Sequence, residues 1–558
     1  MDEPPSLGGS DAAEAHYGYE QLGRIGAALG GSWIDITSDP ELLAAVYDWT
    51  MVRYPRAAQF LSHSALGIQS ILTLGNASPY QQQCLSDLDT CDAVGVFAST
   101  EIAHGTNVLD LGTVAVWHRE GRYLSVHTPD EGSVKLMPNL ADPRVQKHVV
   151  VLARLVVDGV DEGVFPILVC LRGRDGLAAG VEVGTLPTSR HSAPLDHAAF
   201  YFDDLRVPAD ALLGGDWAYF DDSGSFVCEL DRRGARFKRS ASALSVGRVS
   251  CAGGAAAAAR AGWVLALRYA RQRDIDGVAL ADRDEAQRKL VSAAARLTAT
   301  TALVNYARAQ FAVSAPDPAT EALVMAIKPL ASDTAYQVLT DVGTLCGAQA
   351  ALGDNMFGDW LACIAGIWIA EGANDALRCA VGRQPQLVAS GRAAVHMDLS
   401  RVQILDTAQH LSKWHTLLQT RERVVVDAVR AGAGIGSTSI GPDSTAIDTY
   451  KVISERLAAD AMVAAAARLR DPASRAVAEE LAAVYILERI DADAAWFLAH
   501  GGLTASDDLR SELAARYTGL VPHLDTIADA FDVPALPATI DSDYQRRRIA
   551  ALGWQGRW

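Results

Sequence analysis

The 558-residue sequence has no cluster of lysine and arginine residues, and its 67 acidic residues outnumber its 49 basic residues. The formal net charge is −18, so we expect no nucleic-acid partner. No apolar run is long enough to cross a bilayer, because the longest, residues 360–370, has about half the length that a spanning helix needs. Residues 1–18 are acidic and lack the apolar stretch of a secretory signal. We therefore expect a cytoplasmic protein without a membrane partner.

Cysteine residues are few and scattered. The eight of them form no Cys-x-x-Cys pair, and no spacing of histidine and cysteine fits a metal site. We therefore expect no metal and interpret the cysteines as small buried side chains in a reducing compartment. The histidines that lie near the candidate motifs show no partner pattern and are interpreted as structural: His104, His191, His197 and His410.

The first part of the chain is helical in pattern. Residues 1–14 are expected to be disordered, and residues 15–92 to form an N-terminal helical domain. Asp39-Pro40-Glu41 is typical of a helix start, because aspartate caps the free N–H groups and proline is tolerated in the first turn. We find no alternating run in this part.

The pattern changes near residue 93. Short runs rich in β-branched and aromatic residues follow one another, separated by turn residues such as Arg119-Glu120-Gly121-Arg122. The runs are residues 94–98, 113–117, 123–127, 149–157, 164–171 and 197–207. They predict a central β domain over residues 93–215.

Helical periodicity then returns. Leu290, Ala294, Leu297, Thr301 and Val304 follow one helix face. Residues 216–400 are expected to form a helical bundle, and residues 401–558 a further helical domain reached through a Gly/Ser-rich linker at 431–445. The predicted fold class is therefore α+β, with an N-terminal helical domain, a central β-barrel-like domain and a C-terminal helical bundle extended by a second helical domain.

Glu371 stands directly after the most apolar stretch of the chain. A carboxylate beside apolar surface is unfavourable unless it is paired, solvated or used chemically. One interpretation is an ordinary helix terminus that faces water. The other is a proton-handling group aimed into a pocket.

A second chemical motif is Phe97-Ala98-Ser99-Thr100-Glu101-Ile102-Ala103-His104-Gly105-Thr106-Asn107. It combines a strand end, hydroxyl groups and a glycine-containing turn. Its backbone amides and the Thr100 hydroxyl can meet the polar edge of a flat ring, and Gly105 lets the backbone come close. The same residues are also typical of a plain strand-to-loop turn.

The motif is similar to the "FAMTELGHGSN" segment of the acyl-CoA oxidases, within the acyl-CoA dehydrogenase superfamily of flavoproteins. Asp203-Asp204-Leu205-Arg206-Val207-Pro208 resembles the end of that family's β domain. Arg268-Tyr269-Ala270-Arg271-Gln272-Arg273 resembles its "RYAxxRxQFG", although Asp274, Ile275 and Asp276 replace Gln-Phe-Gly. Leu345-Cys346-Gly347-Ala348-Gln349-Ala350 resembles "LCGGxGY", and Lys135-Leu136-Met137-Pro138-Asn139 stands where "KWWPGG" is usual.

The resemblance implies a bound FAD and residues that hold it. Arg273 would reach the diphosphate of the FAD in a neighbouring subunit, since its charged fork suits that group. The resemblance also implies a homodimer. The residues implied to contact the cofactor are Ser99, Thr100, Gly105, Thr106, Asn139, Arg273, Gly347 and Asn374.

Ala370-Glu371-Gly372-Ala373-Asn374 resembles "YEGDN", in which the glutamate is the catalytic base of the oxidases. The implied reaction is α,β-desaturation of an acyl thioester carried by CoA or by an acyl-carrier protein. Glu371 would remove the α-proton, and Gly372 would leave the backbone open to the substrate carbonyl. The β-hydrogen would pass as hydride to FAD, with oxygen as the final acceptor.

Two other functions remain open. The departures at residues 136–139, 274–276 and 348–350 all fall on motifs that face the cofactor, so the chain could be a non-redox binding or scaffold paralogue that has lost FAD. It could also be a flavin oxidase or oxygenase of another substrate class, because fold alone does not fix the chemistry.

Overall fold

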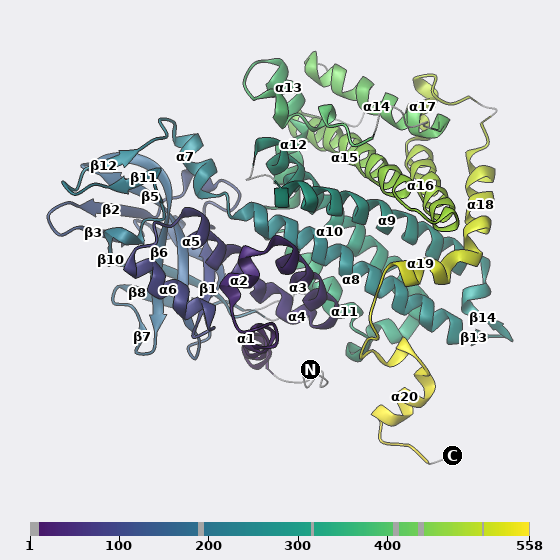
Figure 1. The fold of residues 1–558 in the computed structure, drawn as a ribbon, viewed down its shortest axis with the longest axis horizontal. Helices are drawn as coiled ribbons and strands as arrows, with labels where there is room; N and C mark the ends of the chain where they lie inside the picture. Colours follow the sequence, from purple (N-terminus) through teal and green to yellow (C-terminus); the bar gives the residue numbers. More distant parts are fainter. Residues whose placement is uncertain are drawn as a thin grey trace. The chain divides into compact units, whose positions relative to one another are not determined.

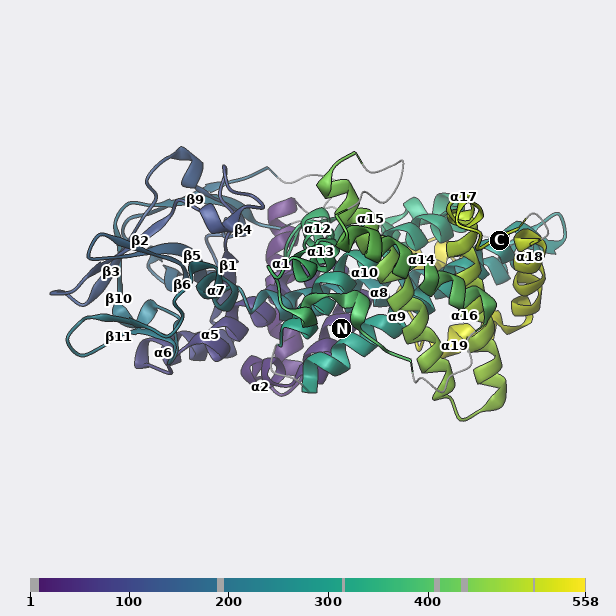
Figure 2. The ribbon, with the colours of Figure 1, turned by 90° about the horizontal axis from the view of Figure 1, so that it is seen from above.

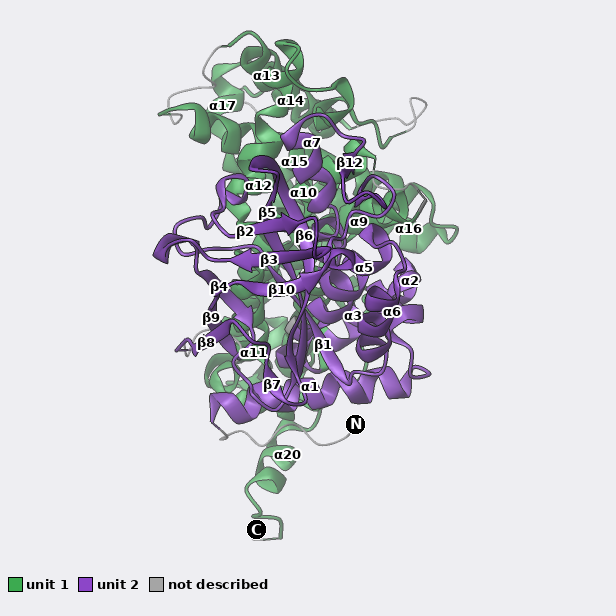
Figure 3. Cartoon of the chain, turned by 90° about the vertical axis from the view of Figure 1, so that its left-hand side faces the viewer, with its two compact units in different colours: residues 1–4, 51–53, 251–558 green, residues 5–50, 54–250 purple. Residues whose placement is uncertain are grey.

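The computed structural model describes residues 10–187, 195–313, 317–405, 412–432, 440–504 and 507–556. The chain has an α+β fold, as expected from the sequence, and divides into two compact units (Figure 3). Unit 2 comprises residues 5–50 and 54–250, and unit 1 comprises residues 1–4, 51–53 and 251–558. The five-part division expected from the sequence remains a prediction beside this two-unit division. His191, His410 and residues 433–439 of the expected 431–445 linker lie outside the described residues, and the last part of that linker, from Pro442, is the start of a helix instead.

Unit 2 begins with short helices that pack on the edge of its sheets. The first, α1, corrects the expected disorder for residues 11–14, while residues 1–9 lie outside the described residues. It begins at Asp11, because the Ser10 hydroxyl accepts a hydrogen bond from the Ala13 N–H and Asp11 and Glu14 favour the positive helix end. Asp39 caps α3, as expected. The helices of this unit are α1 (Asp11–Ala28), α2 (Trp33–Ser38), α3 (Pro40–Arg53, which ends in unit 1), α4 (Pro55–Ala58), α5 (Gln69–Leu74), α6 (Pro79–Asp89) and α7 (Arg233–Ser240).

The sheets of unit 2 confirm the predicted β region and add strands that lack a clear alternating pattern. The strands near the expected runs are β1 (Ala93–Ala98), β2 (Val114–His118), β3 (Tyr123–His127), β5 (Gln146–Val157), β6 (Val160–Gly173), β9 (His197–Phe202) and β10 (Leu205–Pro208). The added strands are β4 (Lys135–Asn139), β7 (Gly176–Leu177), β8 (Val181–Thr185), β11 (Ala218–Phe220) and β12 (Phe226–Cys228). The main sheet has the order β10-β3-β2-β5-β6-β7 (Figure 1). Strands β4, β9 and β8 form a second sheet, with β9 in the middle.

Strand β5 organises the main sheet. One of its edges pairs along its length with β6, and the other pairs first with β1 and then with β2, both in parallel. Residues 146–151 of β5 pair with β1, and residues 154–156 of β5 pair with β2. The segment that carries the 97–107 motif therefore leaves the sheet where β1 ends and returns where β2 begins.

The motif loop is fixed by a buried ion pair. Glu101 and Lys135 are both 0% exposed, and Lys135 Nζ lies 3.0 Å from Glu101 Oε1. The second Glu101 oxygen accepts from the Gly112 N–H at 2.7 Å, and the Thr113 N–H and hydroxyl donate to the first at 2.9 and 2.6 Å. Lys135 Nζ also donates to the carbonyls of Ser99 and Leu152, at 3.3 and 2.8 Å. One ammonium group thus joins the start of the loop to the central strand.

Burial and pairing oppose each other in this ion pair. Burial alone would raise the pKa of Glu101, but Lys135, the Thr113 hydroxyl and the N–H groups of Gly112 and Thr113 outweigh it and hold the pKa below its ordinary value. For Lys135, burial lowers the pKa to about 8, and the attraction of Glu101 offsets only part of that shift.

Unit 1 is built from long helices and one small hairpin. Helix α9 packs along both α10 and α15, and the three run side by side (Figure 2). The expected apolar face at residues 290–304 lies in α9. The elements are α8 (Leu244–Gln272, mostly in this unit), β13 (Asp274–Ile275), β14 (Val278–Ala279), α9 (Asp284–Val313), α10 (Pro318–Cys346), α11 (Phe357–Ile367), α12 (Asn374–Gly382), α13 (Gln384–Ala389), α14 (Lys413–Arg430), α15 (Pro442–Ala467), α16 (Pro472–Ala492), α17 (Ala494–Ala499), α18 (Leu509–Leu520), α19 (Leu524–Ala530) and α20 (Tyr544–Ala551).

By length and composition, helix α8 is apolar enough to cross a membrane. It contains no long uninterrupted apolar run, so the sequence did not indicate this. Within the structure, 94% of its most apolar window is buried. Its small side chains explain the close packing: a Cβ on Gly262 would meet Leu339 of α10 at 2.2 Å, and the Trp263 indole donates to the Leu290 carbonyl of α9 at 2.8 Å. These contacts are those of a core helix.

The Glu101–Lys135 pair predicts a non-additive mutational cycle. Glu101→Gln or Lys135→Met alone leaves one buried charge without its partner, and each is expected to lower the free energy of unfolding by ~3–5 kcal/mol. The double variant removes both charges, so it is expected to lose less than the sum of the two. Urea unfolding of the four proteins measures this coupling.

The matched control is the exposed pair Glu285–Arg288, at 2.8 Å, for which we expect a coupling below ~1 kcal/mol. Additive losses for Glu101 and Lys135 would contradict the inference. The pH dependence checks the sign: because the folded-state pKa of Glu101 lies below 4.5, its stabilising contribution is complete above that pH and is lost as the pH falls through the folded value. Glu101→Gln should remove this part of the acid sensitivity.

Candidate active site

The structure places the predicted site residues in three groups, one in unit 2 and two in unit 1. In unit 2, Ser99 and Thr100 follow β1 and lie beside β4. The Leu136 N–H donates to the Thr100 carbonyl at 3.0 Å, so β4 and the motif run together. The strand that carries Asn139 is therefore joined to the loop that carries Ser99, Thr100, Gly105 and Thr106.

The tip of this loop is open. Ile102 is 56% exposed, and Gly105 and Thr106 are exposed as well. A Cβ on Gly105 would meet no described atom within 4 Å, so the described residues themselves do not require glycine at this position. An open polar turn of this kind leaves room for a flat ring close to the backbone, which fits the FAD expected from the sequence.

Residues 135–139, which stand where the family has "KWWPGG", have an unusual backbone. Met137 lies in the left-handed region, with φ of 78°, at an irregularity in the pairing of β4 with β9. Its side chain is 41% exposed, and its carbonyl accepts a hydrogen bond from His197 Nδ1 at 2.6 Å. A bulky residue rarely takes this conformation, so the surrounding contacts impose it.

Asn139 is held by a buried polar network that the sequence did not reveal. Its side-chain amide donates to the Tyr19 hydroxyl at 2.8 Å, and its carbonyl accepts from Lys147 Nζ at 2.8 Å. Lys147 Nζ also lies 3.4 Å from Asp196 Oδ2. Burial lowers the pKa of Lys147 to about 8, with Asp196 opposing the shift, and burial together with Asp196 raises the pKa of Tyr19. The predicted cofactor contact of Asn139 stays a prediction.

The second group, in unit 1, surrounds Glu371. Helix α11 ends at Ile367, and Glu371 lies in the turn before α12, so it is not part of a helix terminus, which was one of its two interpretations. Glu371 has φ of 57° and Gly372 has φ of 98°, two successive left-handed residues. Glycine adopts this conformation freely, but glutamate does so at a cost of ~1–2 kcal/mol. Backbone strain of this kind is common at functional sites.

Lys328 of helix α10 holds this turn by hydrogen bonds. The sequence had not indicated this residue. The side chain of Lys328 is 0% exposed, and its Nζ donates to the Gly372 carbonyl at 2.8 Å and to Asn374 Oδ1 at 3.0 Å. The Asn374 amide in turn donates to Ser332 Oγ and Asp333 Oδ1, at 3.0 and 3.1 Å. Asn374 is thus engaged inside unit 1, and its predicted contact with FAD stays a prediction.

Fewer apolar side chains cover Glu371 than the sequence predicted. Trp368 packs against Tyr336, with ring centroids 4.4 Å apart, and its carbonyl accepts the Asn374 N–H at 2.9 Å. Ile369, which was expected to add apolar cover, is 64% exposed. One carboxylate oxygen of Glu371, Oε2, is nevertheless shielded from solvent. Trp368 thus joins this turn to Tyr336 of α10 and to Asn374.

The third group contains Arg273 and Gly347, whose neighbours in the chain contact the C-terminal segment. Arg273 ends the α8 motif and is exposed, and the departing residues Asp274–Asp276 form a tight hairpin in which Asp274 Oδ1 accepts the Gly277 N–H at 2.9 Å. Gly347 caps α10 with φ of 55°, a conformation that suits glycine. Their neighbours contact the same segment: Gln272 accepts the Tyr544 N–H at 3.1 Å, and Arg548 donates to Gln349 at 3.2 Å.

A cavity of about 740 Å³ lies at this place in unit 1. Gln349, Arg546 and Arg548 line it together with Tyr544. Arg548 also pairs with Asp354 at 2.8 Å. Guanidinium groups suit diphosphates, so Arg546 and Arg548 are candidate anion contacts that no motif in the sequence had indicated.

Comparisons with known proteins agree with these features. Residues 234–385 match the family described as "Acyl-CoA dehydrogenase, C-terminal domain". The chain is 26% identical over 271 residues to the putative peroxisomal acyl-coenzyme A oxidase 3.2 of Arabidopsis thaliana, which covers 47% of this chain and 39% of that protein. It is 26% identical over 331 residues to human peroxisomal acyl-coenzyme A oxidase 3, covering 54% of this chain and 46% of the relative. The matches thus span less than half the length of these relatives.

Solved structures with the same fold are also acyl-CoA oxidases. Acyl-CoA oxidase 1 of Yarrowia lipolytica superposes with a TM-score of 0.81 at 19% identity, over 98% of this chain and 86% of that one. Acyl-CoA oxidase-2 of Caenorhabditis elegans, solved with FAD, ascaroside-CoA and ATP, gives 0.81 at 16% identity, over 99% and 87%. The chain thus has the fold of the acyl-CoA oxidases and is similar to them in sequence, and its residues 234–385 match the C-terminal domain of the acyl-CoA dehydrogenases.

Proposed function

We propose that the protein is a flavin-dependent oxidoreductase that desaturates an acyl thioester at the α and β carbons, with Glu371 as the base. The observation that carries the proposal is the strained Glu371–Gly372 turn, which buried Lys328 and Asn374 hold in place. Support for the substrate and cofactor classes comes from the acyl-CoA oxidases to which the chain is similar.

The chain's own residues have distinct tasks in this reaction. The carboxylate of Glu371 accepts the α-proton and becomes a carboxylic acid, while the left-handed turn fixes its direction. Gly372 carries no side chain that would obstruct the thioester carbonyl, so backbone N–H groups of the turn are free to stabilise negative charge on that oxygen. The burial of Glu371 Oε2 keeps water away from that side of the carboxylate. When bound, FAD supplies the acceptor for the β-hydrogen and its electron pair.

The residues expected to hold the cofactor offer the chemical groups that FAD needs. Ser99, Thr100, Gly105 and Thr106 offer hydroxyl groups and open backbone. Arg273 and Gly347, with the neighbouring cavity residues Arg546 and Arg548, offer positive charge and an accessible backbone for the diphosphate. Oxygen as electron acceptor, a homodimer, an acyl-carrier protein in place of CoA, and a cytoplasmic location all belong to the proposal as further expectations.

A second candidate is a scaffold paralogue without FAD, which the altered residues 136–139, 274–276 and 348–350 favour. One experiment separates the candidates. The purified full chain is loaded with FAD, its visible spectrum is recorded, and it is incubated with a panel of acyl-CoAs and carrier-bound acyl thioesters. We expect a flavin spectrum and a product lighter by two hydrogens, with peroxide formed if oxygen is the acceptor. A colourless protein that takes up no FAD would favour the scaffold, and bound FAD without any desaturated product would favour another flavin chemistry.

In the same assay, Glu371→Gln should lower the turnover number by ~10²–10⁴-fold, because the amide cannot accept the α-proton. FAD binding and the melting temperature should stay unchanged, since the side chains have the same shape. The matched control is Glu479→Gln on the exposed surface of α16, which should keep full activity. Turnover of Glu371→Gln at the wild-type rate would exclude Glu371 as the base.

Lys328 is expected to act as a positioning residue. Lys328→Met removes the donor to the Gly372 carbonyl and to Asn374, which costs ~1–3 kcal/mol in stability and releases the turn. A displacement of about 1 Å is enough to reduce the rate ~10²-fold, so we expect kcat to fall much more than KM rises. Lys289→Met, which removes an exposed lysine bonded to Thr344, is the control and should change neither. A Lys328→Met enzyme with normal kcat and reduced stability alone would show that Lys328 serves the fold and not the base.

A further inference from the structure

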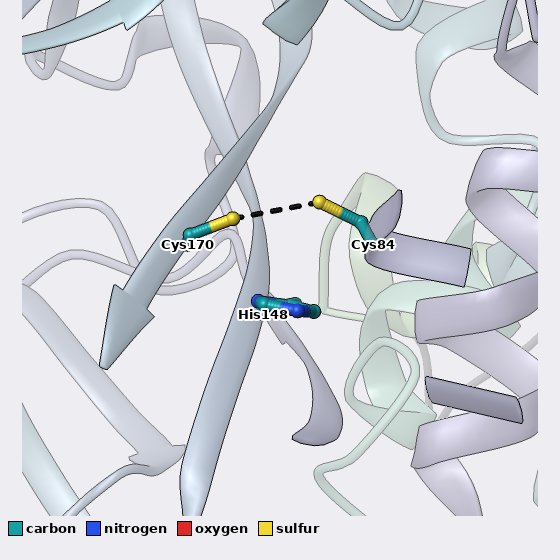
Figure 4. Close-up of side chains that lie close together, drawn as sticks. All are labelled: Cys84, His148 and Cys170. Atoms are coloured by element: carbon teal, nitrogen blue, oxygen red, sulfur yellow. Dashed lines mark hydrogen bonds between the residues drawn. The ribbon is translucent and has the colours of Figure 1, made fainter. Parts of the chain in front are cut away.

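Unit 2 contains a cluster of two cysteines and a histidine that the proposed reaction does not use (Figure 4). Cys84 comes from α6, His148 from β5 and Cys170 from β6, where the last two are direct cross-strand partners. A ring nitrogen of His148 and the two sulfur atoms all lie within 4.8 Å of one another, and the two sulfurs are 3.5 Å apart. All three side chains point to one place between the helix and the sheet.

The histidine of this cluster is oriented like a metal ligand. Its Nε2 lies 2.9 Å from Asp87 Oδ2, while its Nδ1 is buried and bonds to no nitrogen or oxygen atom of the described residues. The Cys170 thiol is the neighbour with which the ring interacts. His148 is only 6% exposed, so water does not readily satisfy Nδ1. A histidine that binds a metal through one nitrogen usually gives the other to a carboxylate, which is the arrangement here.

The donor set selects a class of cation. A tetrahedral zinc ion with Zn–S bonds of about 2.3 Å places two sulfur ligands ~3.8 Å apart, close to the 3.5 Å observed. Two thiolates also balance the charge of a divalent cation in a buried place, where an unbalanced charge is unfavourable. Magnesium and calcium prefer oxygen ligands, so a soft cation fits better.

We propose that Cys84, His148 and Cys170 form a binding site for a soft cation of the Zn²⁺ or Cu⁺ class, with Asp87 orienting the histidine. The ion would replace the contact between the two thiols and bind helix α6 to strands β5 and β6. The site differs from the flavin and base groups described above, so it stands or falls independently of the proposed function. No local spacing indicates it, because the two cysteines are 86 residues apart.

The test uses the full chain, stripped with a chelator and reduced under nitrogen. Zn²⁺ and, separately, Cu⁺ are titrated with a competing chromophoric chelator, Co²⁺ absorption reports thiolate ligation, and the melting temperature is followed. We expect one equivalent of one of these ions, a thiolate-to-cobalt absorption band and a higher melting temperature. The stronger of the two titrations identifies the ion.

Variants decide whether the ion binds at this place. Cys84→Ser and Cys170→Ser should lose the stoichiometric binding, and Asp87→Asn, at a partly exposed position that is not itself a ligand, should weaken it ~10–100-fold. Cys379→Ser, in unit 1, is the control and should bind as the wild type does. The proposal is overturned if the reduced protein binds neither ion, if binding is unchanged in the folded Cys84→Ser and Asp87→Asn variants, or if the mass of the untreated protein shows a Cys84–Cys170 disulfide and the reduced form takes up no metal.

Discussion

Three buried ammonium groups hold the loops of the candidate site. Lys135, Lys147 and Lys328 are each 0% exposed. Each donates a hydrogen bond to the main-chain carbonyl of a residue expected to serve in the site: Ser99, Asn139 and Gly372, respectively. An ammonium group has three donors and no acceptor, and a buried one must find acceptors within the protein. Ser99 and Gly372 lie in loops, and Asn139 is the last residue of β4, so their main-chain carbonyls can accept from an ammonium group. These hydrogen bonds hold the segments that carry the candidate site residues.

The sequence predicted the helices and strands better than it predicted the hydrogen bonds of the buried lysines. Strands such as β1 and β5 follow from local runs of β-branched residues, and helices such as α9 follow from apolar spacing. All three lie close to where these patterns predicted them. The buried lysines have partners that are distant in the chain, and those partners follow only from the folded arrangement. Lys328 did leave one local signal: it is a single charge inside an otherwise apolar stretch of α10, directly before Pro329.

The candidate base illustrates the same limit. Its type and its place after an apolar helix could be read from the sequence, but its backbone conformation could not. The Glu-Gly pair predicts a turn, and in most such turns only the glycine is left-handed. Here Glu371 is left-handed too, which follows from the bonds that Lys328 and Asn374 make on the far side of the turn. Because Glu371 is left-handed and lies after the end of α11 at Ile367, a helix-end geometry would have given it the wrong backbone conformation.

Helix α8 carries a consequence for how the protein is made. Its apolar window is covered by residues that are synthesised much later, including Leu339 and Phe357, which pack at Gly262. The ribosome adds ~5–20 residues per second, so the stretch from Gln272 to Phe357 takes on the order of ten seconds to synthesise. The apolar window of α8 is therefore made before the side chains that bury it in the folded unit. The core of unit 1 around Gly262 is completed only after α10 and α11 have been synthesised.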